Sequence, residues 1–388
     1  MVRTLDPSAG GVARAVLLLS DALVAAGYEV EIVSLDLPDS PWLAETKLKG
    51  RALGASQSTY GYSPSLLPWL HEEGGRFDRV VVNGLWQYHS FAAWRRYAGS
   101  PIPYYVFPHG MLDPWFKRTY PFKHIKKWLY WPWAEYRVLR DAAAALFTSE
   151  QERLLARESF WLYRCREVVV NLGTVAPKVD GSSAREDFYR ACPALRGKNF
   201  LLFLGRLHEK KGCEELIRAF AAFRDASPAG NELRLVLAGP CTDENYLQRL
   251  QRLTGELFPN GNTAAVTFPG MLTGNLKWGA FAAAEAFVLP SHQENFGIAV
   301  VEALACGVPV LISNQVNIWR EIVEDGCGYA ENDDLAGTRR LLERWAASSP
   351  AQRAQMSALA GCCFAERFEI NHAVNLFLRA LENPPRIA

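Results

Sequence analysis

Short apolar runs alternate with amphipathic helical stretches from one end of this 388-residue chain to the other. One helical stretch, residues 12–26, places Val16, Leu19 and Leu23 at helical spacing. Apolar runs that alternate with helices in this way predict an α/β fold, with parallel sheets covered by helices. No short-period sequence repeat is visible, which argues against solenoids and propellers.

The expected strands form two groups separated by a polar segment. In the first half they are Glu29–Ser34, Arg79–Asn83, Tyr104–Phe107, Ala144–Phe147 and Glu167–Val170, and in the second half Phe200–Gly205, Arg234–Ala238, Ala265–Phe268, Ala286–Leu289 and Pro309–Ile312. Between the groups, Gly, Ser, Pro and Lys interrupt the apolar pattern over Leu172–Asp187. The chain is also longer than one hydrophobic core normally organises, so a boundary is expected in this segment.

We therefore expect two doubly wound, Rossmann-like domains of similar size, residues 1–175 and 186–369. The last helical stretch, within 370–388, could cross back onto the first domain. Ligands of such sheets bind beyond the carboxyl ends of the strands, so the two domains are expected to face each other across a central ligand cleft. At the start of the chain, Met1–Leu5 is too short for a full first strand although a glycine-rich turn follows at once. Either the first strand is stubby or the sequence begins late.

Composition excludes several classes of protein. Lys and Arg number 42 against 41 Asp and Glu, a balance that argues against a general nucleic-acid binder. All eight cysteines lie at or after Cys165 without paired metal-ligand spacing, which favours reduced cysteines used as small core residues. No apolar run has the length of a signal peptide or of the ~20 residues that a membrane span needs. These observations favour a soluble or peripheral protein in the cytoplasm.

A group of cations follows the first strand of the second half. Phe200–Phe203 runs into Gly205-Arg206-Leu207-His208-Glu209-Lys210-Lys211-Gly212 and then into a helix. A strand, a glycine turn with cations and a helix N-terminus together form a ready anion site. Arg206 offers a planar fork of donors and Lys211 a mobile point charge, and both suit a diphosphate. The alternative interpretation is a solvated basic loop.

Two glutamates eight residues apart follow a later strand of the same half. The loop Pro290-Ser291-His292-Gln293-Glu294-Asn295-Phe296-Gly297 leads into the apolar helical run Ile298–Ala305, which contains Glu302. Burial of a carboxylate in such a helix is costly unless it is hydrogen-bonded or paired. The hydroxyls of a bound sugar nucleotide would be suitable donors, and the amides of Asn295–Ile298 can face a diphosphate. The alternative for Glu302 is an internal salt bridge.

Together these motifs resemble the family 4 glycosyltransferases. The frame Pro-Ser-x-x-Glu-Asn-Phe-Gly-x-x-x-x-Glu-Ala-Leu-Ala-Cys-Gly-Val-Pro-Val, with Glu294 and Glu302, is similar to the E-x7-E signature of that family. The turn Gly205–Gly212 is similar to its donor-phosphate turn, and Gly10-Gly11 to its N-terminal glycine-rich loop. The likeness spans essentially the whole chain and keeps the three motifs in order, which makes it far more specific than any one of them.

This resemblance implies a GT-B fold, no bound metal or other cofactor, and sugar transfer from a UDP-, GDP- or ADP-sugar with retention at the anomeric carbon. Arg206 and Lys211 would neutralise the departing diphosphate. Glu294 would accept hydrogen bonds from the donor sugar, and Glu302 from the ribose. The rest of the implied donor site comprises Gly10, Gly11, Gly205, Asn295, Phe296, Gly297 and Ile298, together with Met271 and Leu272 as the expected base-side loop after Ala265–Phe268.

His109 follows the expected strand Tyr104–Phe107, in Pro108-His109-Gly110-Met111, at the end of the strand where ligands bind. By itself such a histidine could be a hydrogen-bonded structural residue. In the resembling family a histidine after the corresponding strand faces the donor sugar, which implies a functional role for His109. No residue stands out as a nucleophile, and the resemblance implies same-face attack within an ion pair.

Residues 115–140 form the most basic and most aromatic stretch of the chain. Its basic residues are Lys117, Arg118, Lys123, Lys126, Lys127, Arg137 and Arg140, against the single acid Glu135. Its aromatic residues are Trp115, Phe116, Tyr120, Phe122, Trp128, Tyr130, Trp131 and Trp133. A basic helix with exposed aromatics is typical of an interfacial membrane segment. We therefore expect it to meet an anionic or lipid-linked acceptor at the inner membrane face, the alternative being a core helix with solvated cations.

Two other functions stay open. A nucleotide-sugar epimerase on the same fold would also have two domains and a diphosphate pocket, but it places other carboxylates for proton abstraction. A non-catalytic nucleotide-sugar binder would bind the donor without turnover. The run His109-Gly110-Met111-Leu112-Asp113-Pro114-Trp115 resembles bacterial enzymes that build surface polysaccharides or exopolysaccharides, so a glycan or lipid-linked acceptor is expected. The donor base, its sugar and the oligomeric state are not readable from the sequence.

Overall fold

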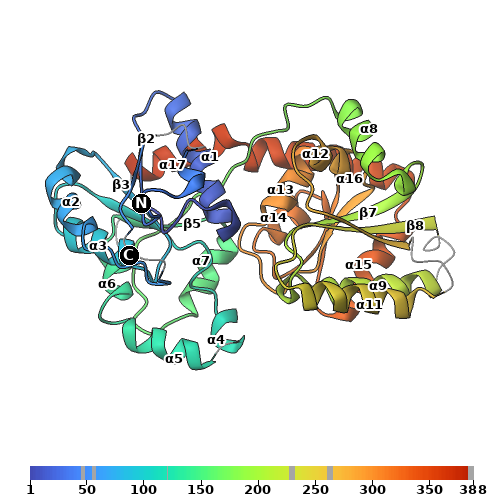
Figure 1. The fold of residues 1–388 in the computed structure, drawn as a ribbon, viewed down its shortest axis with the longest axis horizontal. Coiled ribbons are helices and arrows are strands. Elements are labelled where there is room, and N and C mark those ends of the chain that lie inside the picture. The colour runs from blue at the N-terminus through green and yellow to red at the C-terminus, as the bar shows by residue number, and fades with distance from the viewer. Residues whose placement is uncertain (45–48, 55–57, 120, 227–231, 260–264, 383–388) are drawn as a thin grey trace. The chain divides into compact units, whose positions relative to one another are not determined.

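The computed structural model describes residues 1–44, 49–54, 58–119, 121–226, 232–259 and 265–382. They form two compact units, Met1–Thr174 with Phe368–Ala388 and Val175–Arg367 (Figure 1). Both units are built from parallel sheets with helices, which confirms the predicted α/β class. No helix in these ranges is both long enough and apolar enough to cross a membrane.

The second unit is a six-stranded parallel sheet covered by helices. Its strands are β7 (Asn199–Leu204), β8 (Leu233–Ala238), β9 (Val266–Gly270), β10 (Ala286–Leu289), β11 (Val310–Ser313) and β12 (Gly328–Glu331). Its helices are α8 (Gly181–Ala191), η4 (Pro193–Leu195), η5 (Glu209–Lys211), α9 (Cys213–Ala226), α11 (Glu244–Leu257), α12 (Gly274–Ala283), α13 (Ile298–Ala305), α14 (Trp319–Glu324), α15 (Leu335–Ala347) and α16 (Pro350–Cys363). Helices α9, α11 and α15 cover one face of the sheet, and α12, α13 and α16 cover the other (Figure 1). Residues of β7, β8, β10 and β11 are almost wholly buried, as expected for strands covered on both sides.

The strand order in this sheet is β12-β11-β10-β7-β8-β9. The chain therefore runs outward from β7 through β8 to β9, returns to the middle, and then runs outward again from β10 to β12. This is the doubly wound order with a reversal point between β7 and β10. In such sheets the ligand crevice lies at the carboxyl ends of the two strands that flank the reversal point.

The first unit has parallel strands and a set of shorter helices. Its strands are β1 (Glu31–Ser34), β2 (Lys49–Ala52), β3 (Val80–Asn83), β4 (Tyr104–Phe107), β5 (Ala144–Phe147) and β6 (Glu167–Val169). Its helices are η1 (Pro7–Ala9), α1 (Gly11–Ala25), η2 (Pro41–Leu43), α2 (Leu66–Glu73), η3 (Gly74–Arg76), α3 (Tyr88–Tyr97), α4 (Trp115–Thr119), α5 (Pro121–Tyr130), α6 (Glu135–Arg140), α7 (Glu150–Arg157) and α17 (Ile370–Glu382). Strands β3 to β6 pair in sequence order, and β1 pairs with β2.

Val2 joins these two groups of strands. It forms parallel bridges to Ser34 at the end of β1 and to Asn83 at the end of β3. A single residue thus takes the place of a first strand between β1 and β3, which gives the first unit the same doubly wound order around that position.

The C-terminal helix belongs to the first unit. Helix α17 packs on α1, and the Tyr105 hydroxyl of β4 donates to the carbonyl of Leu381 at 2.7 Å. The ring of Phe377 stacks on Phe107 at 6.1 Å between centroids. A π-helical turn, η7 (Phe364–Phe368), precedes α17 at the point where the chain returns to the first unit.

The ten expected strands are all present, each within two residues of its expected ends. Two strands were not expected, β2 and β12. Strand β2 has the sequence Lys-Gly-Arg-Ala and is exposed over three of its four residues, so it carries no apolar alternation. Strand β12 contains one aromatic residue between glycine and alanine. Both are edge strands, each paired with one neighbouring strand. An edge strand needs fewer apolar side chains than a central strand, because it packs against a neighbour on one side alone.

Candidate functional site

The loops that follow β7 and β10 are joined at the reversal point of the second sheet. The amide of His292 donates to the carbonyl of Lys210 at 2.9 Å. Gly212 has φ +67°, and a Cβ on it would lie 2.2 Å from the carbonyl oxygen of Pro290. Only glycine fits this conformation and this close approach without displacing the backbone. The cation turn and the glutamate loop predicted from the sequence are therefore packed against one another.

Lys211 and Glu294 form an ion pair across these two loops. Both side chains are largely sheltered, with 17% and 22% of their surface exposed. The backbone of Glu294 is fixed from the other side, because its amide donates to the Gln315 carbonyl and its carbonyl accepts from the Asn317 amide, each at 3.0 Å. Two predicted residues 83 positions apart are thus brought into contact.

The carboxylate of Glu294 is held ionised by its surroundings. Burial raises its pKa, but the Lys211 ammonium, which is also its hydrogen-bond donor, outweighs that effect with help from Lys210 and Arg206. The pKa of Glu294 therefore lies below its ordinary value. A carboxylate in this state can only accept hydrogen bonds, which suits recognition of sugar hydroxyls. Arg206 itself is exposed at the end of β7.

Glu302 lies inside α13 and is 2% exposed. Lys277 of α12 donates to its Oε1 at 2.9 Å, and the two side chains are 12% and 3% exposed. The internal salt bridge that was one alternative for Glu302 is therefore present. The Lys277 ammonium also lies 4.1 Å from the ring centroid of Trp278. Breaking a buried pair of this kind leaves an uncompensated charge, which costs about 3–5 kcal/mol.

The start of α13 has the geometry expected of an anion-facing helix end. Gly297, its N-cap, has φ +72°, and Ile298 is the first helical residue. The side chain of Asn295 accepts from the Asn317 amide group at 3.2 Å, and Phe296 is buried. Because the N-cap residue is a glycine, it has no side chain that could accept from the first amides of this helix.

The remaining expected donor residues of the second unit, Gly205, Met271 and Leu272, differ in how accessible they are to a ligand. Gly205 directly follows β7, and its amide donates to the Ala238 carbonyl at 3.0 Å. Met271, after β9, is exposed by 65%, whereas the neighbouring Leu272 is buried. Only the first of these two side chains is available to a ligand on the base side; Leu272 contributes to the core instead.

His292, which the sequence analysis did not assign to the site, forms ion pairs that hold the loop after β10. His292 Nδ1 lies 2.8 Å from Asp333, and its Nε2 lies 3.7 Å from Glu215 of α9. These two carboxylates raise the pKa of His292 to about 9. The protonated ring therefore links the loop after β10 to the loop after β12 and to α9.

His109 lies in the first unit, directly after β4. Its Nε2 lies 2.9 Å from Oδ1 of Asn83, whose amide nitrogen donates to the carbonyl of Met1 at 3.3 Å. The side-chain oxygen of Asn83 therefore faces the ring, so Nε2 carries the proton and Nδ1 is unprotonated. The ring stacks on Phe107 at 5.3 Å between centroids. Burial lowers the pKa of His109 to about 4, and the ring is neutral at physiological pH.

The backbone of His109 is in the left-handed region, with φ +49°, and Gly110 follows at φ +74°. A non-glycine residue with this conformation is strained unless its surroundings hold it. The carboxylate of Glu152 on α7 does so: it accepts from the Gly110 amide at 2.5 Å and from the amide and hydroxyl of Thr148, each at 2.7 Å. Glu152 is 3% exposed. It was not expected from the sequence, because nothing local links it to a turn 42 residues away.

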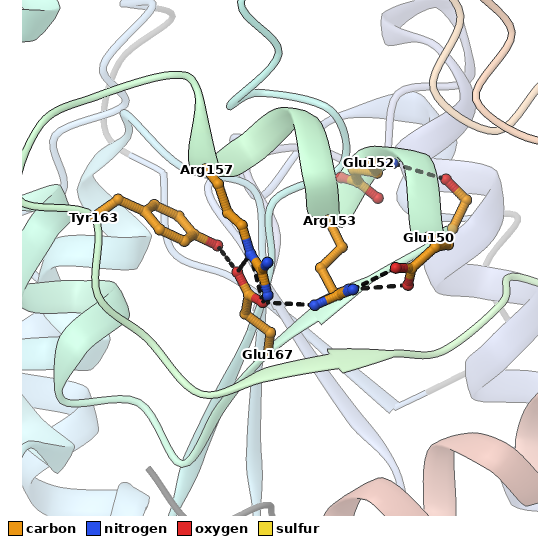
Figure 2. Close-up of polar contacts among 7 residues, drawn as sticks. Glu150, Glu152, Arg153, Arg157, Tyr163 and Glu167 are labelled. Carbon is orange, nitrogen blue, oxygen red and sulfur yellow. Dashed lines mark hydrogen bonds and ion pairs between the residues drawn. The ribbon is translucent and has the colours of Figure 1, made fainter. Parts of the chain in front are cut away.

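Helix α7 carries a second polar group besides Glu152 (Figure 2). Arg153 bridges Glu150 and Glu167, and Arg157 also contacts Glu167. Figure 2 shows Glu152 turned away from this group, near the start of the helix. The two sets of contacts therefore serve different parts of the first unit.

Gly10 and Gly11 begin α1 in the first unit. Gly10 has φ +119°, and Gly11 is the first helical residue. Together with His109 they are the expected site residues that the first unit contributes. Within the described ranges, no group of three or more His, Cys, Asp or Glu side chains is arranged to hold a metal ion.

Two family models match the chain in succession. The model described as "Glycosyl transferase 4-like domain" matches residues 10–173, and "Glycosyl transferases group 1" matches residues 186–344. Together these ranges include most of the chain and contain all three sequence motifs.

Three known proteins illustrate the similarity. An uncharacterized glycosyltransferase of Methanocaldococcus jannaschii is 31% identical over 164 residues, which cover 41% of this chain and 40% of that protein. The GDP-mannose-dependent alpha-(1-6)-phosphatidylinositol dimannoside mannosyltransferase of Mycobacterium tuberculosis is 26% identical over 84% of this chain and 81% of its own. The structure of Anabaena HepE in complex with UDP and glucose superposes with a TM-score of 0.74 at 14% identity, covering 98% of both chains. The chain spans less than half the length of the first curated relatives it matches, and the likeness to HepE shows a shared fold.

Proposed function

Because the chain belongs to the glycosyl transferases group 1 family, we propose that it transfers a sugar from a nucleoside diphosphate sugar to a glycan or lipid-linked acceptor. Transfer retains the anomeric configuration and needs no metal ion. The observation that carries this proposal is the Lys211–Glu294 pair beside Arg206, at the carboxyl ends of β7 and β10.

The charges of this pair fit the departure of a diphosphate. As the bond between the anomeric carbon and the phosphate oxygen breaks, negative charge grows on the diphosphate. Arg206 and Lys211 are cations placed at the same loop junction, next to the start of α13, and preorganised donors of this kind stabilise such charge. The ionised Glu294 accepts hydrogen bonds from the sugar hydroxyls and holds the sugar next to the cations.

Glu302 and His109 have the remaining proposed roles. Glu302 accepts from the ribose hydroxyls while Lys277 keeps its buried carboxylate compensated. His109, neutral with Nδ1 bare, accepts a hydroxyl of the transferring sugar. With a pKa of about 4, it keeps this accepting role throughout the physiological pH range.

A thermal-shift screen against UDP-, GDP- and ADP-sugars in the presence of EDTA tests the donor. A ligand at a hundred times its dissociation constant adds about 2.7 kcal/mol of stability, which raises the melting temperature measurably. We expect a shift with one nucleotide class, lost in Arg206→Ala. The same screen with Arg190→Ala, an exposed arginine of α8, is the matched control. No shift with any donor would contradict the proposed site.

We also propose that residues 115–140 meet the acceptor at a membrane surface. On α5 the apolar side chains Phe122, Ile125 and Leu129 recur at helical spacing and are 84%, 55% and 60% exposed. Trp133 is 70% exposed, whereas Trp131 is fully buried. The exposed aromatic side chains therefore include Phe122, Trp128 and Trp133, whereas Trp131 packs in the core as the alternative interpretation expects. Tyr120 and the side chains of Phe116, Arg118 and Lys123 lie outside the described residues.

The exposed apolar side chains lie beside lysines, a combination that suits an anionic membrane surface. The mycobacterial relative is named for a phosphatidylinositol-linked acceptor, which supports the same class of substrate. Flotation with anionic vesicles at low salt tests this: wild-type protein should float, and Phe122→Ser/Trp133→Ser should not. The control is Met271→Ser/Val323→Ser, which removes two exposed apolar side chains of the second unit. A wild-type protein that stays at the bottom of the gradient would remove the membrane proposal and leave the donor proposal untouched.

A further inference from the structure

A cavity of about 590 Å³ lies on the first unit, at the edge of the sheet opposite to His109. It is lined by the segment after α3, by the junction of α6 and β5, and by the residues that precede β6. All of these lie at the amino ends of the strands, whereas His109 follows the carboxyl end of β4. The volume falls within the roughly 300–1,000 Å³ that is usual for small-molecule sites. Its polar lining consists of Arg140, Asp141, Arg164, Cys165 and Arg166, and we call it the arginine cavity.

The acid in this lining is already neutralised. Arg140 donates to both oxygens of Asp141, at 2.6 and 2.8 Å, and Trp94 adds a third hydrogen bond at 2.9 Å. The hydrogen bond from Arg140 is the largest cause that lowers the pKa of Asp141. The Arg140–Asp141 pair therefore contributes no net charge to the cavity.

Two further acids of this part of the chain, Glu150 and Glu167, are engaged with other residues (Figure 2). Glu167 contacts Arg153 and Arg157 and accepts from the Tyr163 hydroxyl at 2.9 Å. Glu150 is paired with Arg153. In Figure 2 these residues converge between α7 and β6. Among the described residues, the ion pairs of Glu150 and Glu167 are with Arg153 and Arg157, neither of which lines the cavity.

Arg164 and Arg166 are left as uncompensated cations. Tyr163, Cys165 and Glu167 form one chain of hydrogen bonds, with Cys165 Sγ 3.2 Å from the Tyr163 hydroxyl. Neither arginine forms an ion pair within the described ranges, and the Nε of Arg166 is buried without a hydrogen-bond partner there.

A buried donor without a partner is costly, and guanidinium groups favour planar, multi-oxygen anions. We propose that the arginine cavity binds a phosphate group, held by Arg164 and Arg166 with the Arg140–Asp141 pair as one wall. The phosphate can belong to a small phosphomonoester or to a lipid headgroup. The second source has support from the chain itself, since Trp161 and Leu162, 50% and 46% exposed, precede Arg164 in the same loop. This proposal does not depend on the donor site.

Arginine modification with phenylglyoxal, mapped by peptide mass spectrometry, tests the site residue by residue. The full chain is treated in inorganic phosphate, in glycerol phosphate, or with phosphatidylglycerol vesicles, each against chloride or phosphatidylcholine at equal ionic strength. We expect protection of Arg164 and Arg166 by about tenfold or more, the change that one lost charge-assisted hydrogen bond would bring. Exposed Arg51 and Arg190 should show no protection.

The treatments distinguish a free phosphate from a lipid headgroup, and they distinguish the arginine cavity from the donor site. Protection by the soluble phosphates indicates a free phosphate ligand, and protection by anionic vesicles alone indicates a headgroup. Arg206, read in the same digest, reports the donor site independently. The variant Arg164→Gln/Arg166→Gln should lose affinity for the protecting ligand by about tenfold, while Arg51→Gln/Arg190→Gln, with the same loss of charge, keeps it. Equal modification of Arg164, an exposed residue, under every condition would overturn the proposal.

Discussion

The carboxylate of Glu152 accepts the amide of Gly110 at 2.5 Å and thereby holds the left-handed turn that carries His109. The same carboxylate accepts two hydrogen bonds from Thr148 at the end of β5. One buried side chain on α7 therefore ties together the carboxyl ends of β4 and β5.

Glu152→Gln should destabilise the protein and impair transfer. The amide nitrogen of glutamine would face a donor in place of an oxygen, and a buried N–H left without an acceptor costs about 1–3 kcal/mol. Urea unfolding measures this cost, and the transfer rate at saturating substrates reports the loss of the His109 turn. Glu150→Gln, on the same helix but half-exposed, is the control and should change stability by less than about 1 kcal/mol. If Glu152→Gln unfolds like wild type, the turn does not depend on this carboxylate.

Arg206→Ala and Lys211→Ala should have different effects on stability and similar effects on activity. Each should cost roughly 2.7–4 kcal/mol of transition-state stabilisation, as loss of a preorganised donor does. Arg206 is exposed, so its removal should leave unfolding unchanged, whereas loss of Lys211 removes the cation partner of Glu294. Values of kcat/KM and melting temperatures together check this. Wild-type turnover in either variant at saturating donor would show that the catalytic site lies elsewhere.

Lys277→Met should be more harmful to stability than the double variant Lys277→Met/Glu302→Leu. The single change leaves a carboxylate that is 2% exposed without its cation, at about 3–5 kcal/mol, and the double change removes both charges. A double-mutant cycle from urea unfolding measures the coupling. Glu302→Gln should mainly raise KM for the donor, because the ribose contact contributes to binding. Equal stability of Lys277→Met and wild type would mean that the ion pair is not maintained in solution.

His292 should stabilise the protein at neutral pH and lose this effect in alkali. Its pKa is about 9 in the folded protein, above the ordinary value of about 6.5 in an unfolded chain. The contribution is therefore fully present below pH 6.5, falls as pH rises through 9, and amounts to about 3 kcal/mol. The stability gap between wild type and His292→Gln should be large at pH 6 and nearly absent at pH 10. His372→Gln, an exposed histidine, is the control, and a gap that does not change with pH would contradict the ion pairs with Asp333 and Glu215.

Much of the fold could be predicted from local patterns. Apolar runs such as Phe200–Phe203 and Ala286–Leu289 have few alternatives to a buried parallel strand, because each is short, apolar and followed by a polar turn. The cation turn and the glutamate loop were found for the same reason: each has its chemistry within eight consecutive residues. Strand β2 was missed because its exposed residues carry no such pattern.

The α/β class, the strands around the reversal point and the residue types of the anion site all follow from local sequence patterns. The three-dimensional arrangement was needed to show which distant residues meet: Lys211 with Glu294, Lys277 with Glu302, Glu152 with the His109 turn, and Arg164 and Arg166 with the Arg140–Asp141 pair. The physical reason is that hydrophobic periodicity is set by neighbours along the chain. The pairing of charges across loops depends on strand order and on backbone contacts, such as that between Gly212 and Pro290, which no local pattern records.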